Sequence, residues 1–461
     1  MKIVLGNASI ITVDKDRRLF DDGAVAVQDG MIEAVGTTEE IKRKFSDWEF
    51  TDMKRHIIMP GLVNAHVHLT QSLIKGCADD VSLVDFLKNG VWRLMGHYSA
   101  EDAGLSAKLC VLEMIKGGTT TFVETLLCHH YGLDGITDTV ADSGMRAFLA
   151  KSVMDKSTYA DRGSIMDPGM VEDGDLCLKQ AVEWKEKSEG AGNGRIHIWL
   201  GPRPVGSSTK EMLEKVSQTA AEHDMGIAIH FCEVKEDVEL MKNKYQSIPG
   251  KFMEDAGILT DRTLMAHCVW ITREDMKYMK KHGSTVVHCP ASNAKLASGI
   301  APVAQMLEEG VNVALGTDAG TCDNAYDMFD AMRLAAILPK AVNLDPLVVP
   351  AESVIEMATI NGAKAVKMDN EIGSLEAGKK ADLITIDCNH PRIVPNINPV
   401  SAVVYSAKAS DVDNVMIDGK WVVRNRNVLT MAEQDILDEA NASIRRVLSQ
   451  AGVENKSRWQ Q

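Results

Sequence analysis

The sequence contains no long hydrophobic run and no excess of positive charge. No apolar segment of its 461 residues approaches the roughly 18 residues of a membrane-spanning helix, and the N-terminus lacks the apolar core of a signal peptide. The 50 Lys and Arg stand against 65 Asp and Glu, which gives a net charge of −15. A surface of this charge argues against binding to nucleic acid or to anionic membranes. We therefore expect a soluble protein that binds neither.

Paired cysteine motifs are also missing. The chain has nine cysteines, an odd number, and no two of them form a C-x-x-C motif. Cysteines scattered in this way are typical of reduced thiols, whereas a secreted disulfide scaffold has regularly spaced pairs. The sequence shows no internal repeat and no low-complexity segment, and 45% of its residues are hydrophobic. These features predict a globular cytoplasmic protein with a large core.

Eight short apolar runs, most of them separated by amphipathic helical segments, occupy the middle of the chain. They cover residues 57–68, 119–125, 146–154, 197–203, 226–233, 263–270, 284–290 and 311–318. Eight units of a strand followed by a helix predict a (β/α)₈ TIM-type barrel, and a doubly wound open sheet is the alternative. Continuous apolar strands are also typical of a parallel sheet that is buried on both faces.

Short strands separated by Gly and Asp-Gly turns flank this region on both sides. They fill residues 1–57 and return after about residue 370, up to residue 425. The simplest architecture joins them in one small β-sandwich domain built from both termini. We therefore predict a discontinuous β domain (1–57 and 370–425), a hydrolase barrel (58–369), and a C-terminal helix with a tail (426–461).

Polar side chains mark the ends of five apolar runs. Functional groups of a barrel gather at the carboxyl ends of its strands, so these side chains are expected to converge. His66 and His68 point the same way because side chains alternate along a strand. The remaining members of the set are His230, Glu233, His267, His288 and Asp318. A lone histidine is more often structural, but together these groups predict a site for Zn²⁺ or a similar divalent metal.

Five sequence motifs occur in an order that resembles the amidohydrolase superfamily. They read MPGLVNAHVH, IHFCE, AHCVW, HCPASNAKLASGIAPV and LGTDAG. The likeness covers nearly the whole chain and is greatest to the cytosine-deaminase-like branch, which includes methylthioadenosine/S-adenosylhomocysteine deaminases and s-triazine hydrolases. The resemblance therefore implies a metal-dependent hydrolase.

The resemblance also implies a role for each matching residue. His66, His68, His230 and Asp318 match the ligands of one divalent metal ion, Zn²⁺ or alternatively Fe²⁺. Glu233 matches the acid that shuttles protons to a ring nitrogen, His267 matches the histidine that orients the attacking water, and Asp318 can accept that water's proton. A bound metal lowers the pKa of water from about 15.7 toward 7 and so supplies hydroxide near neutral pH.

Other residues are expected to contact the substrate. His288, with Ser292 and Asn293 on the loop that follows it, matches positions near the pocket. Trp92 is suited to stack on a flat ring, with lid packing as the alternative.

Two cations complete the expected substrate contacts. Arg203 stands where the family's nucleoside deaminases have a histidine, and Lys151 stands in place of an arginine that holds a carboxylate. Arg203 offers a planar fork of donors for a carboxylate or a carbonyl, unless a neighbouring acid engages it. Lys151 is expected at the rim of the pocket or in a structural contact.

The sequence therefore predicts a hydrolytic deaminase. Hydroxide would attack the amino-bearing ring carbon of a small N-heteroaromatic amine, such as a purine, pterin, pyrimidine or nucleoside, and ammonia would leave. One alternative is a chloro- or alkylamino-hydrolase of s-triazine-like rings, or a cyclic amidohydrolase. Another is a catalytically silent scaffold. The resemblance also suggests a homo-oligomer, dimeric or larger.

Overall fold

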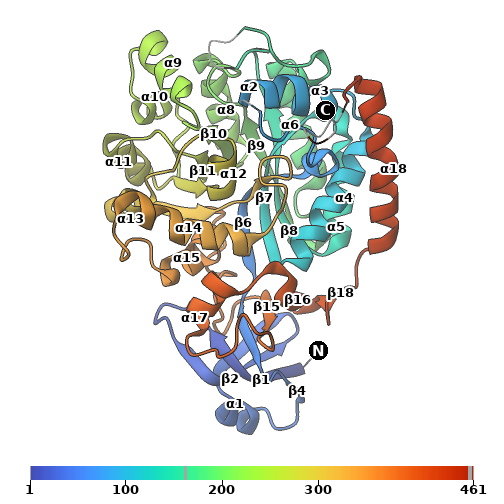
Figure 1. The fold of residues 1–461 in the computed structure, drawn as a ribbon, viewed down its shortest axis with the longest axis vertical. Coiled ribbons are helices and arrows are strands. Elements are labelled where there is room, and N and C mark those ends of the chain that lie inside the picture. Colours follow the sequence, from blue (N-terminus) through green and yellow to red (C-terminus); the bar gives the residue numbers. More distant parts are fainter. Residues whose placement is uncertain (1, 82, 160–162, 455–458, 460–461) are drawn as a thin grey trace.

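The computed structural model describes residues 2–81, 83–159, 163–454 and 459, and two sheets organise this part of the chain (Figure 1). One sheet is entirely parallel and runs in the order β13-β12-β11-β10-β9-β8-β7-β6-β14. Its strands are β6 (Leu62–His68), β7 (Thr119–Leu127), β8 (Arg146–Val153), β9 (Ile196–Pro202), β10 (Ile227–Phe231), β11 (Thr263–His267), β12 (Thr285–His288), β13 (Asn312–Leu315) and β14 (Asp318–Ala319).

The last two segments are pieces of one interrupted strand. β13 pairs with β12, whereas β14, two residues further along the chain, pairs with β6 and closes the sheet on itself. Across the interruption, the Asn64 side-chain amide donates to the Thr317 hydroxyl (2.7 Å) and accepts from the Thr317 backbone N–H (3.0 Å). The parallel sheet is therefore the predicted (β/α)₈ barrel, with a break in its eighth strand.

Helices cover the outside of the barrel because each follows a strand and buries one apolar face against it. In α11, for example, Met276 and Met279 are buried, Thr272 caps the start and Gly283 ends the helix with a positive φ. The main helices are α4 (Ala100–Lys116), α5 (Leu133–Ser143), α6 (Gly174–Ser188), α8 (Lys210–Glu222), α9 (Lys235–Tyr245), α10 (Pro249–Asp255), α11 (Arg273–His282), α12 (Pro290–Lys295), α13 (Val303–Glu309), α14 (Met328–Asn343), α15 (Ala351–Met357) and α16 (Ile360–Ala365). Short helices α2 (Leu83–Asp85) and α3 (Trp92–Met95) lie between β6 and α4.

The second sheet combines strands from both ends of the chain. Its order is β18-β17-β16-β15-β5-β1-β2-β3, with β4 beside β1. One face packs around an apolar cluster that includes Ile3, Val25, Ile58 and Leu383, so N-terminal and C-terminal strands share one small core. The strands are β1 (Lys2–Ile11), β2 (Leu19–Gln28), β3 (Met31–Thr37), β4 (Glu49–Asp52), β5 (His56–Pro60), β15 (Leu383–Asp387), β16 (Val412–Ile417), β17 (Lys420–Arg424) and β18 (Asn427–Val428). Helix α1 (Thr38–Lys44) covers part of it.

The first apolar run of the sequence, residues 57–68, is divided between the two sheets. β5 pairs with β1 and β15 in the terminal sheet, and after Gly61 the chain continues as β6 in the barrel. The predicted division into domains remains a prediction, and the terminal sheet extends to Pro60 instead of ending at residue 57.

Helix α18 (Glu433–Ala451) lies along the barrel beside α4 (Figure 1). Asp102 of α4 accepts hydrogen bonds from Ser443 and Arg446 of α18. At the end of α18, the Ala451 carbonyl accepts from Arg93 Nε (2.7 Å). The C-terminal helix is therefore attached to the barrel next to the segment that carries Trp92.

Candidate active site

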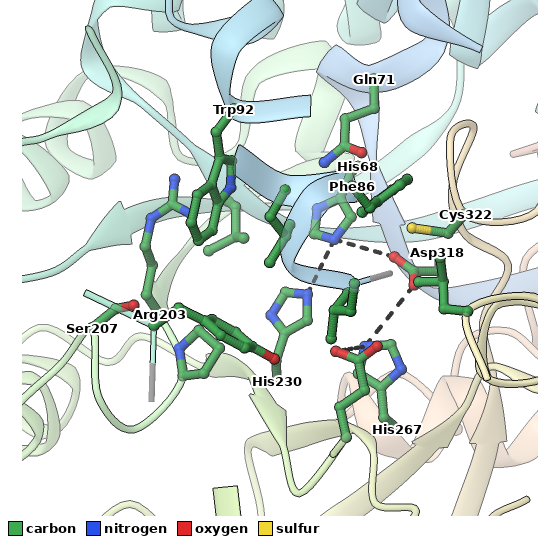
Figure 2. Close-up of a pocket in the computed structure, with 17 residues that line it drawn as sticks. His68, Gln71, Phe86, Trp92, Arg203, Ser207, His230, His267, Asp318 and Cys322 are labelled. Carbon is green, nitrogen blue, oxygen red and sulfur yellow. Dashed lines mark hydrogen bonds and ion pairs between the residues drawn. The ribbon is translucent and has the colours of Figure 1, made fainter. Parts of the chain in front are cut away.

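Five ring or carboxylate side chains meet at the carboxyl ends of β6, β10 and β11 and at the first residue of β14. They are His66, His68, His230, His267 and Asp318. Figure 2 shows four of them, His68, His230, His267 and Asp318. Four of the five are buried and His230 is partly buried, and the rings of His66 and His230 have their centroids 4.8 Å apart. The structure thus brings together residues that the sequence separates by more than half the chain.

The backbone at these strand ends adopts an unusual conformation. His267 and Asp318 have φ angles of +73° and +63°, and Cys232 and Cys268 lie nearby with +49° and +50°. Non-glycine residues rarely occupy this left-handed region, and such strain concentrates at functional sites because surrounding contacts must hold it. The positive φ values redirect the side chains at the ends of the strands.

A metal-binding group of four residues lies at this point. One ligand atom each from His66, His230, His267 and Asp318 fits within a separation of 4.8 Å. His68 adds a fifth, because its Nε2 lies 3.1 Å from His230 Nε2 and 3.2 Å from Asp318 Oδ1. Nitrogen and carboxylate donors at such separations suit a divalent transition metal.

The partners of the ring nitrogens support this interpretation. Thr125 Oγ1 lies 2.8 Å from His66 Nδ1, and Asn293 Oδ1 lies 2.9 Å from His267 Nδ1. These contacts orient the rings, and they leave Nε2 of His66 and of His267 buried without a hydrogen bond. Metal-ligating histidines typically bind a protein group through one nitrogen and offer the other to the ion. The residues present therefore fit a metal.

Burial and charge set the protonation of the group. Burial lowers the pKa of His66 to about 4 and that of His230 well below its usual value, which keeps both imidazoles neutral. Burial alone would raise the pKa of Asp318, but the imidazoles of His66 and His68, 3.4 and 3.2 Å from its Oδ1, hold that pKa well below its usual value. Burial also opposes a charge on His68, yet Asp318 and Glu124 raise its pKa to about 9. A cation that binds here competes with a proton on His68.

A second carboxylate stands beside the metal-binding group. Glu233 Oε2 lies 3.9 Å from His267 Nε2, and Glu233 Oε1 accepts a hydrogen bond from Ser298 (3.1 Å). Its side chain lines the same cavity as His230 and Asp318. Glu233 is thus held at the edge of the site, where it can reach a bound molecule.

A cavity opens above these groups. Trp92 and Arg203, both predicted as substrate contacts, line it. Further lining side chains that sequence reasoning did not single out are Gln71, Phe86, Tyr159 and Ser207. Apolar and aromatic walls with a few polar groups are typical of sites for flat organic molecules.

Lys151 and His288 do not line this cavity in the described part of the chain. For Lys151 this agrees with the structural contact expected as one of two possibilities, and a contact of His288 with the substrate remains a prediction. In the parallel register Lys151 pairs with Leu200, and its neighbour Ala150 faces the barrel interior. His288 pairs with Leu315, while Val287 faces the interior. Since side chains alternate along a strand, both residues point to the outer face. Lys151 there forms an ion pair with Glu172 (3.0 Å).

Ser292 and Asn293 also lie outside the cavity lining and contact the metal-binding group instead. Ser292 Oγ donates to Asp318 Oδ2 (2.6 Å), and Asn293 binds His267 as described above. These contacts position two residues of the site, and a contact of Ser292 or Asn293 with the substrate remains a prediction.

Glu124 and Thr125 are the supporting residues that sequence reasoning missed. Glu124 Oε1 lies 3.8 Å from His68 Nδ1 and accepts from the Leu126 N–H (2.8 Å), so it faces the back of that ring. The signal was present, because the second apolar run ends in Glu-Thr just as the others end in His or Asp.

A family model shows where this arrangement belongs. Residues 57–422, most of the chain, match the model described as the amidohydrolase family. The chain belongs to the amidohydrolase family. A second model, described as an imidazolonepropionase-like composite domain of bacteria, matches residues 23–45 in the terminal sheet and α1. The family match spans the barrel together with β15 and β16 of the terminal sheet, and it ends within β17.

Curated members of the amidohydrolase family resemble the chain along its whole length. A 5-methylthioadenosine/S-adenosylhomocysteine deaminase of Syntrophomonas wolfei is 36% identical over 97% of this chain and 100% of its own. A 5′-deoxyadenosine deaminase of Methanosarcina acetivorans is 36% identical over 98% of this chain and 99% of its own.

Solved structures of amidohydrolases share the fold. An adenosine deaminase of Xanthomonas campestris with bound zinc has a TM-score of 0.88 and 28% identity, and covers 97% of this chain and 98% of its own. A zinc complex of atrazine chlorohydrolase from Arthrobacter aurescens has a TM-score of 0.87 at 24% identity, with 96% and 100% covered. Among the described residues, no helix is both long and apolar enough to traverse a bilayer.

Proposed function

We propose that this chain is a zinc-dependent hydrolase that removes the amino group of a small N-heteroaromatic amine and releases ammonia. The observation that carries the proposal is the position of Glu233 beside the metal-binding group of His66, His230, His267 and Asp318. The relatives named above as deaminases and the zinc in a 28% identical structure support it.

One zinc ion per chain would be held by His66, His68, His230 and Asp318, with His267 next to it. A metal in such a site lowers the pKa of a bound water toward 7 and thereby makes a nucleophile available near neutral pH. The protein's own task is to move protons. Asp318, kept ionised by its histidine neighbours, can accept a proton from the water, and the ring of His267 is held by Asn293 in a fixed orientation.

Glu233 would carry the proton to the substrate. It would protonate the ring nitrogen next to the amino-bearing carbon, which makes that carbon a better electrophile. Asp318 would pass the proton taken from the water to the amino group, which leaves as ammonia. The remaining hydroxyl proton would return to Glu233 as the ring carbonyl forms. General acid–base steps of this kind contribute about 10²–10⁴-fold each. Ser298 holds one carboxylate oxygen and leaves the other directed toward His267.

The test compares Glu233→Gln with the matched variant Glu239→Gln, an exposed carboxylate on α9. Ammonia release is measured across purine, pterin, pyrimidine, triazine and nucleoside amines, and zinc per chain is measured by mass spectrometry. We expect Glu233→Gln to keep its zinc and lose about 10²–10⁴-fold in kcat, while Glu239→Gln behaves as wild type. Full turnover by Glu233→Gln would remove Glu233 from this role.

The same assay separates the alternatives. Release of chloride or an alkylamine from s-triazines, with no ammonia from any amine, would indicate a triazine-type hydrolase, and opening of cyclic amides would indicate a cyclic amidohydrolase. A protein that takes up less than about a tenth of a metal ion per chain after reconstitution would be a scaffold. We also propose a cytoplasmic location and a homo-oligomer, which fractionation and light scattering test.

A further inference from the structure

Four Lys or Arg side chains are buried in this structure: Arg146, Lys151, Arg195 and Arg203. Three of them have a carboxylate partner. Arg146 Nη2 lies 2.7 Å from Asp418 Oδ1, Lys151 Nζ lies 3.0 Å from Glu172 Oε2, and Arg195 Nη1 lies 3.7 Å from Asp418 Oδ2. Within residues 2–81, 83–159 and 163–454, no carboxylate forms an ion pair with Arg203. Arg203 is the exception among the buried cations.

The immediate neighbours of Arg203 do not neutralise it. Arg203 Nη2 donates to Cys128 Sγ at 3.7 Å, and its Nε is buried without a partner. Burial raises the pKa of Cys128 to about 11, so this thiol is uncharged near neutral pH. The nearby carboxylate of Glu172 is engaged by Lys151 and by the His129 N–H.

The guanidinium is placed at the cavity and is held by an aromatic ring. Arg203 follows the end of β9, is 3% exposed, and has its guanidinium carbon 5.9 Å from the centroid of Trp92. Both side chains line the cavity that Glu233 and Asp318 also line, and Figure 2 shows them on the side away from His267 and Asp318. The cavity therefore has an acid and metal-binding end and a guanidinium end.

A buried charge without a partner is costly, so its retention beside a cavity indicates that a bound molecule supplies the partner. Guanidinium presents N–H groups in a rigid planar fork that matches a carboxylate or a carbonyl oxygen lying in the plane of a ring. It has no acceptor of its own, so it cannot satisfy a donor on the ligand.

We propose that Arg203 binds an acceptor oxygen of the substrate, so that the preferred substrates are aminoheteroaromatic rings that also bear a ring carbonyl or a carboxylate. The ring lies between the two ends of the cavity, with its amino-bearing carbon toward Glu233 and its acceptor oxygen toward Arg203, beside Trp92. This inference rests on the proposed deaminase function, whose substrate class it narrows.

The test uses substrate pairs in which one member bears the acceptor oxygen and the other lacks it. Guanine and 2-aminopurine differ by a ring carbonyl and the N1 hydrogen that accompanies it. The pair of 2-aminopyrimidine-5-carboxylate and 2-aminopyrimidine differs by a carboxylate and leaves the ring nitrogens unchanged. For at least one pair we expect wild-type kcat/KM to favour the oxygen-bearing member by about 10–100-fold, the worth of a hydrogen bond to a charged group. The pair that shows the preference identifies the source of the oxygen.

The variant Arg203→Met should abolish that preference, because it should lower kcat/KM for the oxygen-bearing ring about 10–100-fold more than for the bare ring. Arg195→Met, a buried arginine at the other end of the barrel, should keep the preference, and zinc content and circular dichroism check that both variants fold. Equal losses on both members in Arg203→Met, or no preference in wild type, would overturn the inference while leaving the deaminase function intact.

A binding measurement separates this inference from the proposed function. Calorimetry with guanine and 2-aminopurine, and with the pyrimidine pair, reports the preference without turnover. If wild type binds the oxygen-bearing ring more tightly, and Arg203→Met does not, yet no amine releases ammonia, then the subsite stands and the deaminase function fails. If neither pair shows a binding preference, the inference is wrong.

Discussion

Buried charged and polar groups are paired at the amino end of the barrel, whereas some of those at its carboxyl end lack partners. At the amino end, Arg146 on the first residue of β8 reaches the terminal sheet and forms ion pairs with Asp382 (3.3 Å) and Asp418 (2.7 Å). At the carboxyl end, imidazoles and carboxylates crowd together, and Nε2 of His66 and of His267 remains without a hydrogen bond.

The difference shows which end is built for stability and which for chemistry. Charges at the amino end neutralise one another across the junction of the two sheets, so they link the parts of the fold. Some groups at the carboxyl end lack a hydrogen-bond partner until a ligand binds. Functional sites commonly lower the stability of the free protein in this way. Substitutions at the two ends should therefore separate activity from stability.

The largest effect is expected from Asp318→Asn, which removes the carboxylate of the metal-binding group. Because metal catalysis is worth several kcal/mol, kcat/KM for ammonia release should fall by at least about 10³-fold. In denaturant unfolding of the metal-free proteins, the variant should lose some stability, because His66 and His68 hold the pKa of Asp318 below its usual value and so favour its charge in the folded state. That loss should be smaller than the loss from removing Arg146 at the amino end, and an equal or larger loss would contradict the division of roles.

The next effect is expected from Arg146→Met at the opposite end. Removing one partner of a buried ion pair leaves the others uncompensated, so the free energy of unfolding should fall by about 3–5 kcal/mol. Activity per folded molecule should remain as in wild type, and the exposed Arg445→Met on α18 serves as the control. If Arg146→Met lost activity without losing stability, the comparison between the two ends would fail.

The smallest effect is expected from a pair of threonine substitutions on β7, one beside the metal-binding group and one away from it. Thr125→Val removes the hydroxyl beside His66 Nδ1 with little change in volume, and should weaken zinc affinity by about 10–100-fold in a chelator competition. Thr121 is the matched control, because its hydroxyl on the same strand is buried without a partner in the described structure. Thr121→Val should bind zinc as wild type does, and equal losses in both variants would show a general effect on packing.

Much of the fold and the core of the site could be predicted because both depend on local patterns. Eight apolar runs gave the barrel, and the polar residue that ends a run had to lie at one rim. His66 and Asp318 could thus be placed together although no local feature connects them. The split of residues 57–68 at Gly61 was missed, since one uninterrupted apolar run carries no sign that two sheets share it.

The side-chain directions of Lys151 and His288 could not be predicted for a different reason. Alternation along a strand states that neighbours point to opposite faces, but it does not say which neighbour faces inward. The register with Leu200 and Leu315 decides that, and register is set by contacts between distant segments. At His267 and Asp318 the positive φ angles break the alternation altogether.

The break in the eighth strand ties the completion of the fold to the completion of the site. Asp318 belongs to the short segment that joins the last strand of the barrel to the first, beside Val67 and next to His66. A chain that ended before β14 would hold every histidine of the group and still lack the carboxylate that brings negative charge among them. The group of ligands is therefore complete only when β14 has paired with β6 and the barrel is closed. Metal binding by the folded chain would thus serve as a probe of barrel closure.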